Sequence, residues 1–203
     1  MLYIVIPLCI TLIILNYSKR ELTRCKTNTK KSAYTERTFT MNDNKTRALV
    51  ITGSFVALTI VVTMTSKIPI PGGYGYVNLG DAVVLVSALL LGKKSGAYIG
   101  GISSALADIF LGYMMFVPLT LITKGLEGYL CGLIYEKFPT PITSIIAAIV
   151  GGATMVLGYF IGEIYLYDLG VSLAAIWPNT MQAIIGVIVA IILFNILKNR
   201  ITR

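Results

Sequence analysis

Four ionisable side chains lie inside segments of this chain that are otherwise apolar enough to dissolve in lipid. They are Asp81, Asp108, Lys124 and Glu127. A charge at membrane depth costs at least about 2.5 kcal/mol on insertion scales, so such groups usually face a cavity or one another. Carboxylates accept hydrogen bonds from N–H groups. These residues therefore predict the wall and floor of a ligand pocket inside a membrane protein.

The sequence gives little support for a catalytic site or a metal site. The chain has no histidine, which excludes Ser-His-Asp triads, HExxH zinc sites and histidine-based acid–base catalysis. Its three cysteines show no CxxC spacing, so they indicate neither a disulfide framework nor a metal site. No nucleophile–base pair and no phosphate-binding GxxxxGK[ST] loop is evident. We expect no catalytic residue, no metal, no cofactor and no ATPase activity in this chain.

The composition indicates a polytopic helical membrane protein. Of its 203 residues 56% are hydrophobic and 13% charged, whereas about a quarter of the residues in soluble domains are charged. The apolar runs are long and do not alternate, which argues against a β-barrel. The net charge of +8 lies mostly in residues 1–40 and at the ends of apolar segments, as membrane topology requires. We therefore expect a lipid bilayer as the environment and no nucleic-acid partner.

Two parts of the chain differ in character. Residues 1–40 combine a short apolar stretch with a basic, polar linker, and the stretch is shorter than the 17 to 25 residues of a usual span. It is an N-terminal anchor helix, an uncleaved signal-like segment, or a spurious extension with the natural start at Met41. Residues 41–203 form the main domain, an all-α bundle of six transmembrane helices. The expected helices cover about 45–66, 79–91, 95–111, the segment from Pro118 to 135, 141–165 and 171–197.

The basic residues predict how this bundle sits in the membrane. Eight Lys and Arg lie on one side of the six spans, and among short loops the other side has only Lys67. The positive-inside rule then places both ends of the six-helix domain on the cytoplasmic side of the membrane. The loop 67–78, rich in Pro and Gly, is not helical and lies outside. It is interpreted either as a lid over a flat ligand or as part of an interfacial aromatic belt.

In this topology polar groups from different spans converge near the outer side. Aromatic rings could stack on a flat ligand, and amides could pair with ring heteroatoms. Lys124 either binds the ligand or neutralises Glu127 and Asp108, and we favour the ion pair because a lone buried cation is costly. The predicted substrate-binding residues are Tyr74, Tyr76, Asn78, Asp81, Asp108, Lys124, Glu127, Tyr159, Glu163, Trp177, Asn179 and Gln182.

Two stretches of the main domain resemble a known family. The sequence GDAVVLVSALLLGKKSGAYIGGISSALADIFLGY, followed by VPLTLITKGLEGYLCGLIYE, is similar to the S components of energy-coupling factor (ECF) vitamin transporters. The resemblance covers about residues 45–198 and is greatest to the group for hydroxymethylpyrimidine, pyridoxine-type or riboflavin substrates. Residues 1–40 depart from the family's usual short N-terminus.

The resemblance implies a substrate-binding subunit of the bacterial plasma membrane that captures a small-molecule vitamin outside the cell. It would deliver the vitamin inward with a membrane coupling (T) subunit and two ATP-binding-cassette (ABC) ATPase subunits. Gly53 and Ala57 match the small-xxx-small face through which the family contacts the coupling subunit, whereas spacing alone is equally typical of ordinary helix packing. A stand-alone secondary transporter or facilitator, with its carboxylates as proton-coupling groups, is the alternative.

Overall fold

A computed structural model describes residues 43–70 and 75–201 of the chain. The chain divides into two compact units, Met1–Ile51 and Thr52–Arg203. Of the first unit only residues 43–51 are described, and they are helical. The interpretations of residues 1–40 therefore fall outside the described part of the chain. Everything that follows concerns the second unit.

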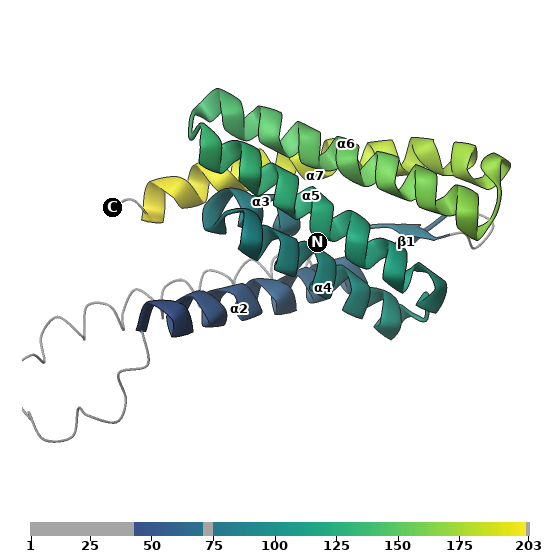
Figure 1. The fold of residues 1–203 in the computed structure, drawn as a ribbon, viewed down its shortest axis with the longest axis horizontal. Helices are drawn as coiled ribbons and strands as arrows, with labels where there is room; N and C mark the ends of the chain where they lie inside the picture. Colours follow the sequence, from purple (N-terminus) through teal and green to yellow (C-terminus); the bar gives the residue numbers. More distant parts are fainter. Residues whose placement is uncertain (1–42, 71–74, 202–203) are drawn as a thin grey trace, which may run out of the picture. The chain divides into compact units, whose positions relative to one another are not determined.

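Six α-helices account for most of the described residues. Two short strands and one 3-10 turn complete the structure (Figure 1). In chain order the elements are α2 (Asp43–Thr65), β1 (Ile68–Pro69), β2 (Tyr76–Val77), α3 (Gly80–Leu91), α4 (Lys93–Leu111), η1 (Met114–Phe116), α5 (Val117–Lys137), α6 (Pro141–Leu166) and α7 (Leu169–Ile201).

A single glycine joins α3 to α4. Gly92 has φ 84°, a left-handed conformation that side chains with a Cβ rarely adopt. Glu136 of α5 stabilises the start of α4, since its Oε1 accepts the backbone N–H of Lys93 at 2.9 Å and its Oε2 lies 3.3 Å from the Lys93 Nζ. A carboxylate at a helix N-terminus also interacts favourably with the helix dipole. The tight turn therefore brings α4 back alongside α3.

Glycines also set how closely α4 approaches α5. A Cβ on Gly100 would collide with the backbone carbonyl of Lys124, and one on Gly96 would lie 2.7 Å from the backbone oxygen of Gly128. Only residues without a side chain allow two helices this close. This contact fixes the backbone of α5 at the turn that carries Lys124.

One end of the bundle holds three of the connections. The β1–β2 hairpin, η1 and the α6–α7 turn lie at this end, and the α5–α6 turn lies at the opposite end (Figure 1). The strands pair antiparallel, with Ile68 opposite Val77 and Pro69 opposite Tyr76. Ser66 secures the chain on the far side of the hairpin, because its Oγ accepts the backbone N–H of Leu79 at 2.8 Å.

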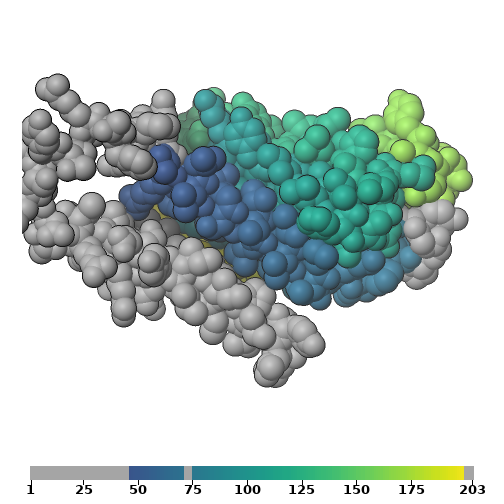
Figure 2. All heavy atoms as spheres, turned by 90° about the horizontal axis from the view of Figure 1, so that it is seen from below, coloured from purple at the N-terminus to yellow at the C-terminus, as the bar shows by residue number. Residues whose placement is uncertain are grey.

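Four of the described helices are long and apolar enough to cross a membrane: α2, α5, α6 and α7. Their outward faces carry large apolar residues such as Ile146, Leu157 and Ile188, which are about half exposed. The helix α2 (blue) forms part of the surface in the space-filling view (Figure 2). A multi-pass, all-α membrane protein is thus confirmed. That α3 and α4 also span the bilayer, which would give six spans, stays a prediction.

The observed helices agree closely with the expected ones. The largest difference is at the end of α7, which continues to Ile201 rather than to 197, and the other helix ends differ by at most two residues. The described residues of the loop after α2 are non-helical as predicted, although the two short strands among them were not foreseen. Two-residue strands leave too little alternation in the sequence to be recognised.

Candidate functional site

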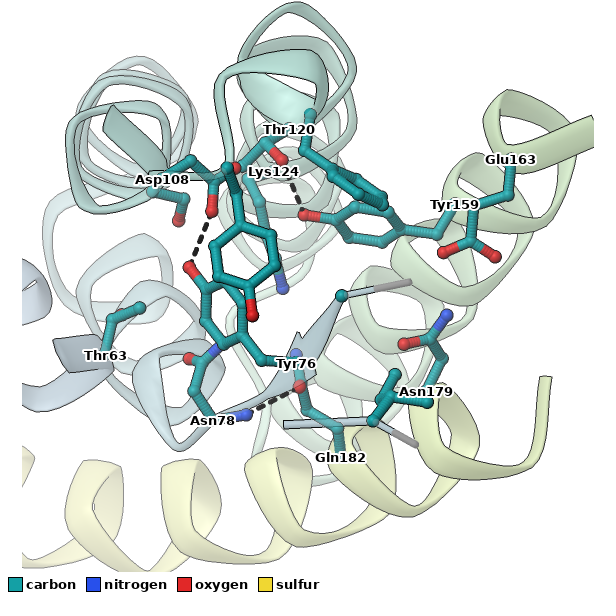
Figure 3. Close-up of a pocket in the computed structure, with 15 residues that line it drawn as sticks. Thr63, Tyr76, Asn78, Asp108, Thr120, Lys124, Tyr159, Glu163, Asn179 and Gln182 are labelled. Carbon is teal, nitrogen blue, oxygen red and sulfur yellow. Dashed lines mark hydrogen bonds between the residues drawn. The ribbon is translucent and has the colours of Figure 1, made fainter. Parts of the chain in front are cut away.

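A pocket opens among the helices at the hairpin end of the bundle. About 480 Å³ of space not filled by atoms lies within it, and this figure includes space open to solvent. Every α-helix except α3 contributes at least one residue to its wall, together with the hairpin and η1 (Figure 3). Its lining consists of Thr63, Ile70, Gly75, Tyr76, Asn78, Ser104, Asp108, Tyr113, Phe116, Thr120, Lys124, Tyr159, Glu163, Asn179 and Gln182.

The hairpin and α4 meet at one wall. The Tyr76 hydroxyl donates to Asp108 Oδ1 at 2.6 Å (Figure 3). Burial and the adjacent Asp108 carboxylate raise the pKa of the Tyr76 phenol, so it stays protonated and acts as the donor. Asp108 is 3% exposed, and its Oδ2 accepts no hydrogen bond from the part of the chain that the structure describes. A buried acceptor without a partner is costly, and this one is available to a ligand.

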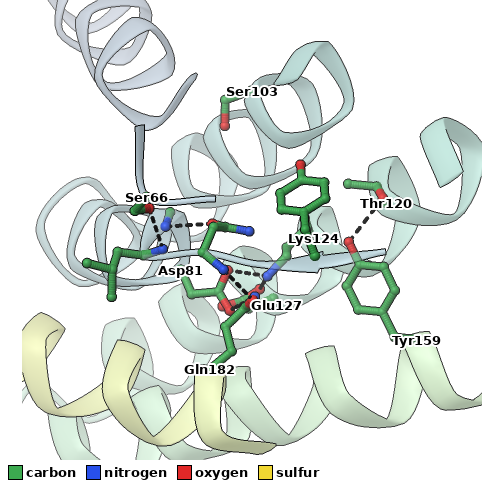
Figure 4. Close-up of polar contacts among 12 residues, drawn as sticks. Ser66, Asp81, Ser103, Thr120, Lys124, Glu127, Tyr159 and Gln182 are labelled. Atoms are coloured by element: carbon green, nitrogen blue, oxygen red, sulfur yellow. Dashed lines mark hydrogen bonds and ion pairs between the residues drawn. The ribbon is translucent and has the colours of Figure 1, made fainter. Parts of the chain in front are cut away.

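The floor of the pocket rests on a buried ion cluster. Lys124 Nζ pairs with Asp81 Oδ1 and, at 3.0 Å, with Glu127 Oε2 (Figure 4). Lys124 is 2% exposed, Asp81 1% and Glu127 0%. Lys124 and Glu127 stand three residues apart on α5 and therefore share a face, whereas Asp81 comes from the first turn of α3. The ammonium thus has two carboxylate partners before any ligand arrives.

Gln182 of α7 connects this ion cluster to the hairpin. Its Nε2 donates to Asp81 Oδ2 at 2.8 Å, and its Oε1 accepts the backbone N–H of Asn78 at 2.7 Å. Both ends of the amide are thereby used, as buried polar groups require. Asn78 directly follows β2, so the position of the hairpin is tied to the ion cluster by one side chain.

The opposite wall carries a second carboxylate. Glu163 of α6 is 3% exposed, and the amide of Asn179 faces it (Figure 3). Its Oε2 accepts no hydrogen bond within the described ranges 43–70 and 75–201. Glu163 and Asp108 therefore present open acceptor atoms from α6 and α4, on two sides of the same pocket.

Aromatic rings complete the wall near the mouth. The ring centroids of Tyr76 and Tyr113 lie 5.0 Å apart, and those of Tyr113 and Phe116 lie 6.3 Å apart. The Lys67 ammonium sits 4.7 Å from the Tyr113 centroid, within the range of a cation–π contact. On the inner side, the Tyr159 and Thr120 hydroxyls are 3.0 Å apart. The pocket thus offers flat apolar faces together with a few fixed polar groups.

The structure sorts the predicted site residues into groups. Eight of the twelve line the pocket: Tyr76, Asn78, Asp108, Lys124, Tyr159, Glu163, Asn179 and Gln182. Asp81 and Glu127 do not line it and instead hold Lys124 from below. Trp177 is absent from the lining and its side chain is 71% exposed. Tyr74 lies outside the described residues.

The role expected for Lys124 is refined in one respect. It forms a structural ion pair with Glu127, as favoured from the sequence, but its second direct partner is Asp81 and not Asp108. Gly53 and Ala57 are both exposed on α2, and a Cβ added to Gly53 would meet nothing within 4 Å. This face stays a predicted partner-binding surface.

Sequence reasoning missed several lining residues, namely Thr63, Ile70, Gly75, Ser104, Tyr113, Phe116 and Thr120. Helical spacing could have found two of them. Ser104 precedes Asp108 by four residues and Thr120 precedes Lys124 by four, so each pair shares a helix face. Thr63 gave no such signal, because a threonine in an apolar helix usually bonds its own backbone.

The chemistry of the pocket suits recognition of a small molecule. The described residues contain no group of three or more His, Cys, Asp or Glu that could hold a metal ion. The pocket combines aromatic faces, amides and two acceptor oxygens without partners, as expected for recognition of a small, flat, polar molecule.

Comparisons with known proteins agree with this picture. A family model described as the S component of an ECF-type riboflavin transporter matches residues 43–199. An uncharacterized protein of Pyrococcus woesei is 38% identical over 141 residues, covering 70% of this chain and 95% of that protein. The thiamine precursor transporter HmpT of Lactococcus lactis is 31% identical over 159 residues, covering 78% of this chain and 92% of HmpT.

A solved structure shares the fold. It is described as the S component of a bacterial ECF transporter and superposes with a TM-score of 0.62 at 22% identity, covering 78% of this chain and 99% of that structure. The match extends the agreement from sequence to the arrangement of the helices.

Proposed function

The chain belongs to the S-component family of ECF-type transporters, and from this premise we propose that it binds a hydroxymethylpyrimidine-type vitamin precursor in the pocket at the hairpin end. As a member of this family it is a substrate-binding membrane subunit and not an enzyme. The substrate is taken from the name of the HmpT relative and from the chemistry of the pocket. Pyridoxine-like compounds and riboflavin are the other members of the proposed substrate group.

The observation that carries the proposal is the pair of open carboxylate oxygens in an aromatic-lined pocket. An aminopyrimidine is flat, so it can stack on rings such as those of Tyr76 and Tyr159. Its amino and hydroxymethyl groups are hydrogen-bond donors at two edges. Asp108 Oδ2 and Glu163 Oε2 are acceptors that lack partners within the described chain.

The proposed assembly follows from the family. We propose that the chain works with a membrane coupling subunit and two ABC ATPase subunits, which hydrolyse ATP on its behalf. Gly53 and Ala57 on the exposed face of α2 are the proposed contact with the coupling subunit. The basic residues at the end opposite the hairpin, such as Lys93 and Lys137, support a cytoplasmic position for that end.

Two experiments test the substrate. Mass spectrometry first identifies the ligand that co-purifies with the protein from the expressing cells. The emptied protein is then titrated with hydroxymethylpyrimidine, pyridoxine and riboflavin. We expect hydroxymethylpyrimidine to bind with the highest affinity of the three. Failure of all three to bind would reject the proposed substrate group.

Uptake measured with and without the coupling and ATPase subunits tests the assembly. We expect vitamin uptake only when all subunits are present. If this chain alone took up the vitamin and an uncoupler abolished that uptake, the chain would instead be a stand-alone transporter whose carboxylates couple transport to protons.

A further inference from the structure

The charges around the pocket are unbalanced. The pocket and the layer beneath it contain four carboxyl groups, from Asp81, Asp108, Glu127 and Glu163, and one ammonium, from Lys124. Both carboxylates beneath the floor are paired with that ammonium. Lys67, the cation near the mouth, lies over the Tyr113 and Tyr76 rings and does not line the pocket. Within the described chain, no cation in the lining is left without an anionic partner.

The run of backbone donors ahead of α3 is also occupied. Successive N–H groups ahead of a helix can form an anion-binding concavity, and such a run precedes α3 at residues 78–80. Here each N–H already has a side-chain acceptor. Gln182 Oε1 takes that of Asn78 at 2.7 Å, Ser66 Oγ that of Leu79 at 2.8 Å, and Asn78 Oδ1 that of Gly80 at 2.7 Å.

Three buried side-chain atoms in the lining lack a partner among the described residues: the neutral hydroxyl of Thr63 and two carboxylate oxygens. Asp108 Oδ2 and Glu163 Oε2 are buried, line the pocket from two sides (Figure 3) and have no hydrogen-bond partner among the described residues. A carboxylate oxygen is matched by an N–H or O–H donor and is repelled by another anion. The pocket is thus complementary to a ligand with donors at two edges and opposed to one that carries a phosphate or carboxylate.

We propose that this site discriminates by charge: it admits the free alcohol form of its vitamin and rejects the phosphate ester, with Asp108 and Glu163 as the selecting residues. The inference rests on the proposed function for the identity of the alcohol. Among the described residues, a phosphate group would find no unpaired cation in the lining and no open N–H group at 78–80, and it would lie beside two carboxylates. Phosphorylation of the substrate, where it occurs, must then follow uptake.

Three alcohol–ester pairs test the inference on the purified protein in nanodiscs. Hydroxymethylpyrimidine is compared with its monophosphate, pyridoxine with pyridoxine phosphate, and riboflavin with flavin mononucleotide, by equilibrium binding. For each alcohol that binds, we expect its ester to bind at least 100-fold more weakly. Failure of all three alcohols overturns the proposed function and this inference with it, whereas an ester that binds within threefold of its alcohol overturns the inference alone.

Two isosteric variants assign the selection to residues. In Asp108→Asn and in Glu163→Gln we expect the alcohol to bind at least tenfold more weakly and the alcohol-to-ester affinity ratio to fall at least fivefold. A purely structural role would weaken both ligands equally and leave the ratio unchanged, which would overturn the assignment.

Asp168→Asn is the matched control, because it removes a negative charge at the same end of the bundle. Asp168 is exposed in the α6–α7 turn, where its Oδ1 accepts the backbone N–H of Val171 at 2.9 Å, a role that asparagine also performs. We expect its ratio to match that of the unmodified protein. A ratio that falls as far as in the pocket variants would show a general field effect and overturn the selecting role of Asp108 and Glu163.

Discussion

Two sets of buried charges lie close together in this protein and differ in how they are satisfied. In the ion cluster of Asp81, Lys124 and Glu127, the cation and both carboxylates are paired directly. Glu127 also keeps one oxygen without a hydrogen-bond partner in the described chain, but Glu127 does not line the pocket. On the pocket walls, Asp108 and Glu163 each keep such an oxygen, and neither forms an ion pair with a described residue. The difference indicates that a charge inside a membrane helix is no evidence of ligand binding by itself. An acceptor left open toward a cavity is the more specific sign.

The largest expected effect comes from removing the cation of the ion cluster. In Lys124→Met, two buried carboxylates lose their partner, and breaking a buried pair in this way costs about 3–5 kcal/mol. We expect a large drop in the thermal unfolding midpoint of the purified protein. The same midpoint measured for Lys198→Met, a lysine outside the cluster, serves as the control. An unchanged midpoint in Lys124→Met would mean that the cluster does not stabilise the fold.

A matched pair of carboxylate variants separates the two regions directly. Glu127→Gln and Glu163→Gln make the same chemical change on neighbouring helices. We expect Glu163→Gln to weaken substrate binding at least tenfold with little effect on stability. Glu127→Gln should lower stability by about 1–3 kcal/mol, as expected for a disturbed buried hydrogen bond, and change affinity less than threefold. The comparison between the regions fails if both variants affect the same property.

The sequence alone predicted the fold well but did not separate these two regions. Long apolar segments and their Gly and Pro boundaries are local signals, and the helix bounds agree within a few residues. Pairing between distant helices is not local. Nothing near Asp81 in the sequence indicates that it meets Lys124, 43 residues away. Asp81 was therefore predicted to bind substrate, and the ion pair favoured for Lys124 was expected with Glu127 and Asp108.

Trp177 shows the same limitation of the sequence, because it was predicted to bind substrate but does not line the pocket. An aromatic residue beside Asn179 is typical of a binding site, but residues two apart on a helix point in different directions. The structure exposes Trp177 and directs Asn179 into the pocket. Which face of α7 meets the pocket depends on how α7 packs on its neighbours, and this is set by contacts that the order of residues does not reveal.

A smaller effect is expected at the hydrogen bond between the hairpin and α4. Tyr76→Phe removes the hydroxyl that donates to Asp108 Oδ1 at 2.6 Å. The loss of one such bond is worth about 0.5–1.5 kcal/mol, which corresponds to roughly two- to tenfold in affinity. We expect substrate to bind more weakly by this factor in equilibrium titrations, because Asp108 is less firmly oriented. Tighter binding would instead show that the Tyr76 hydroxyl competes with the substrate for Asp108.

The smallest effect is expected at Trp177, and it tests whether the boundary of the pocket is drawn correctly. Its ring is 71% exposed, whereas Asn179 two residues later is 6% exposed and lines the pocket. Trp177→Phe should change substrate affinity by less than twofold, while Asn179→Leu removes an amide beside Glu163 and should weaken binding at least fivefold. A Trp177→Phe variant with the larger loss would require α7 to rotate on substrate binding. The contrast between the ion-paired carboxylates and those that open into the pocket would then describe only the empty protein.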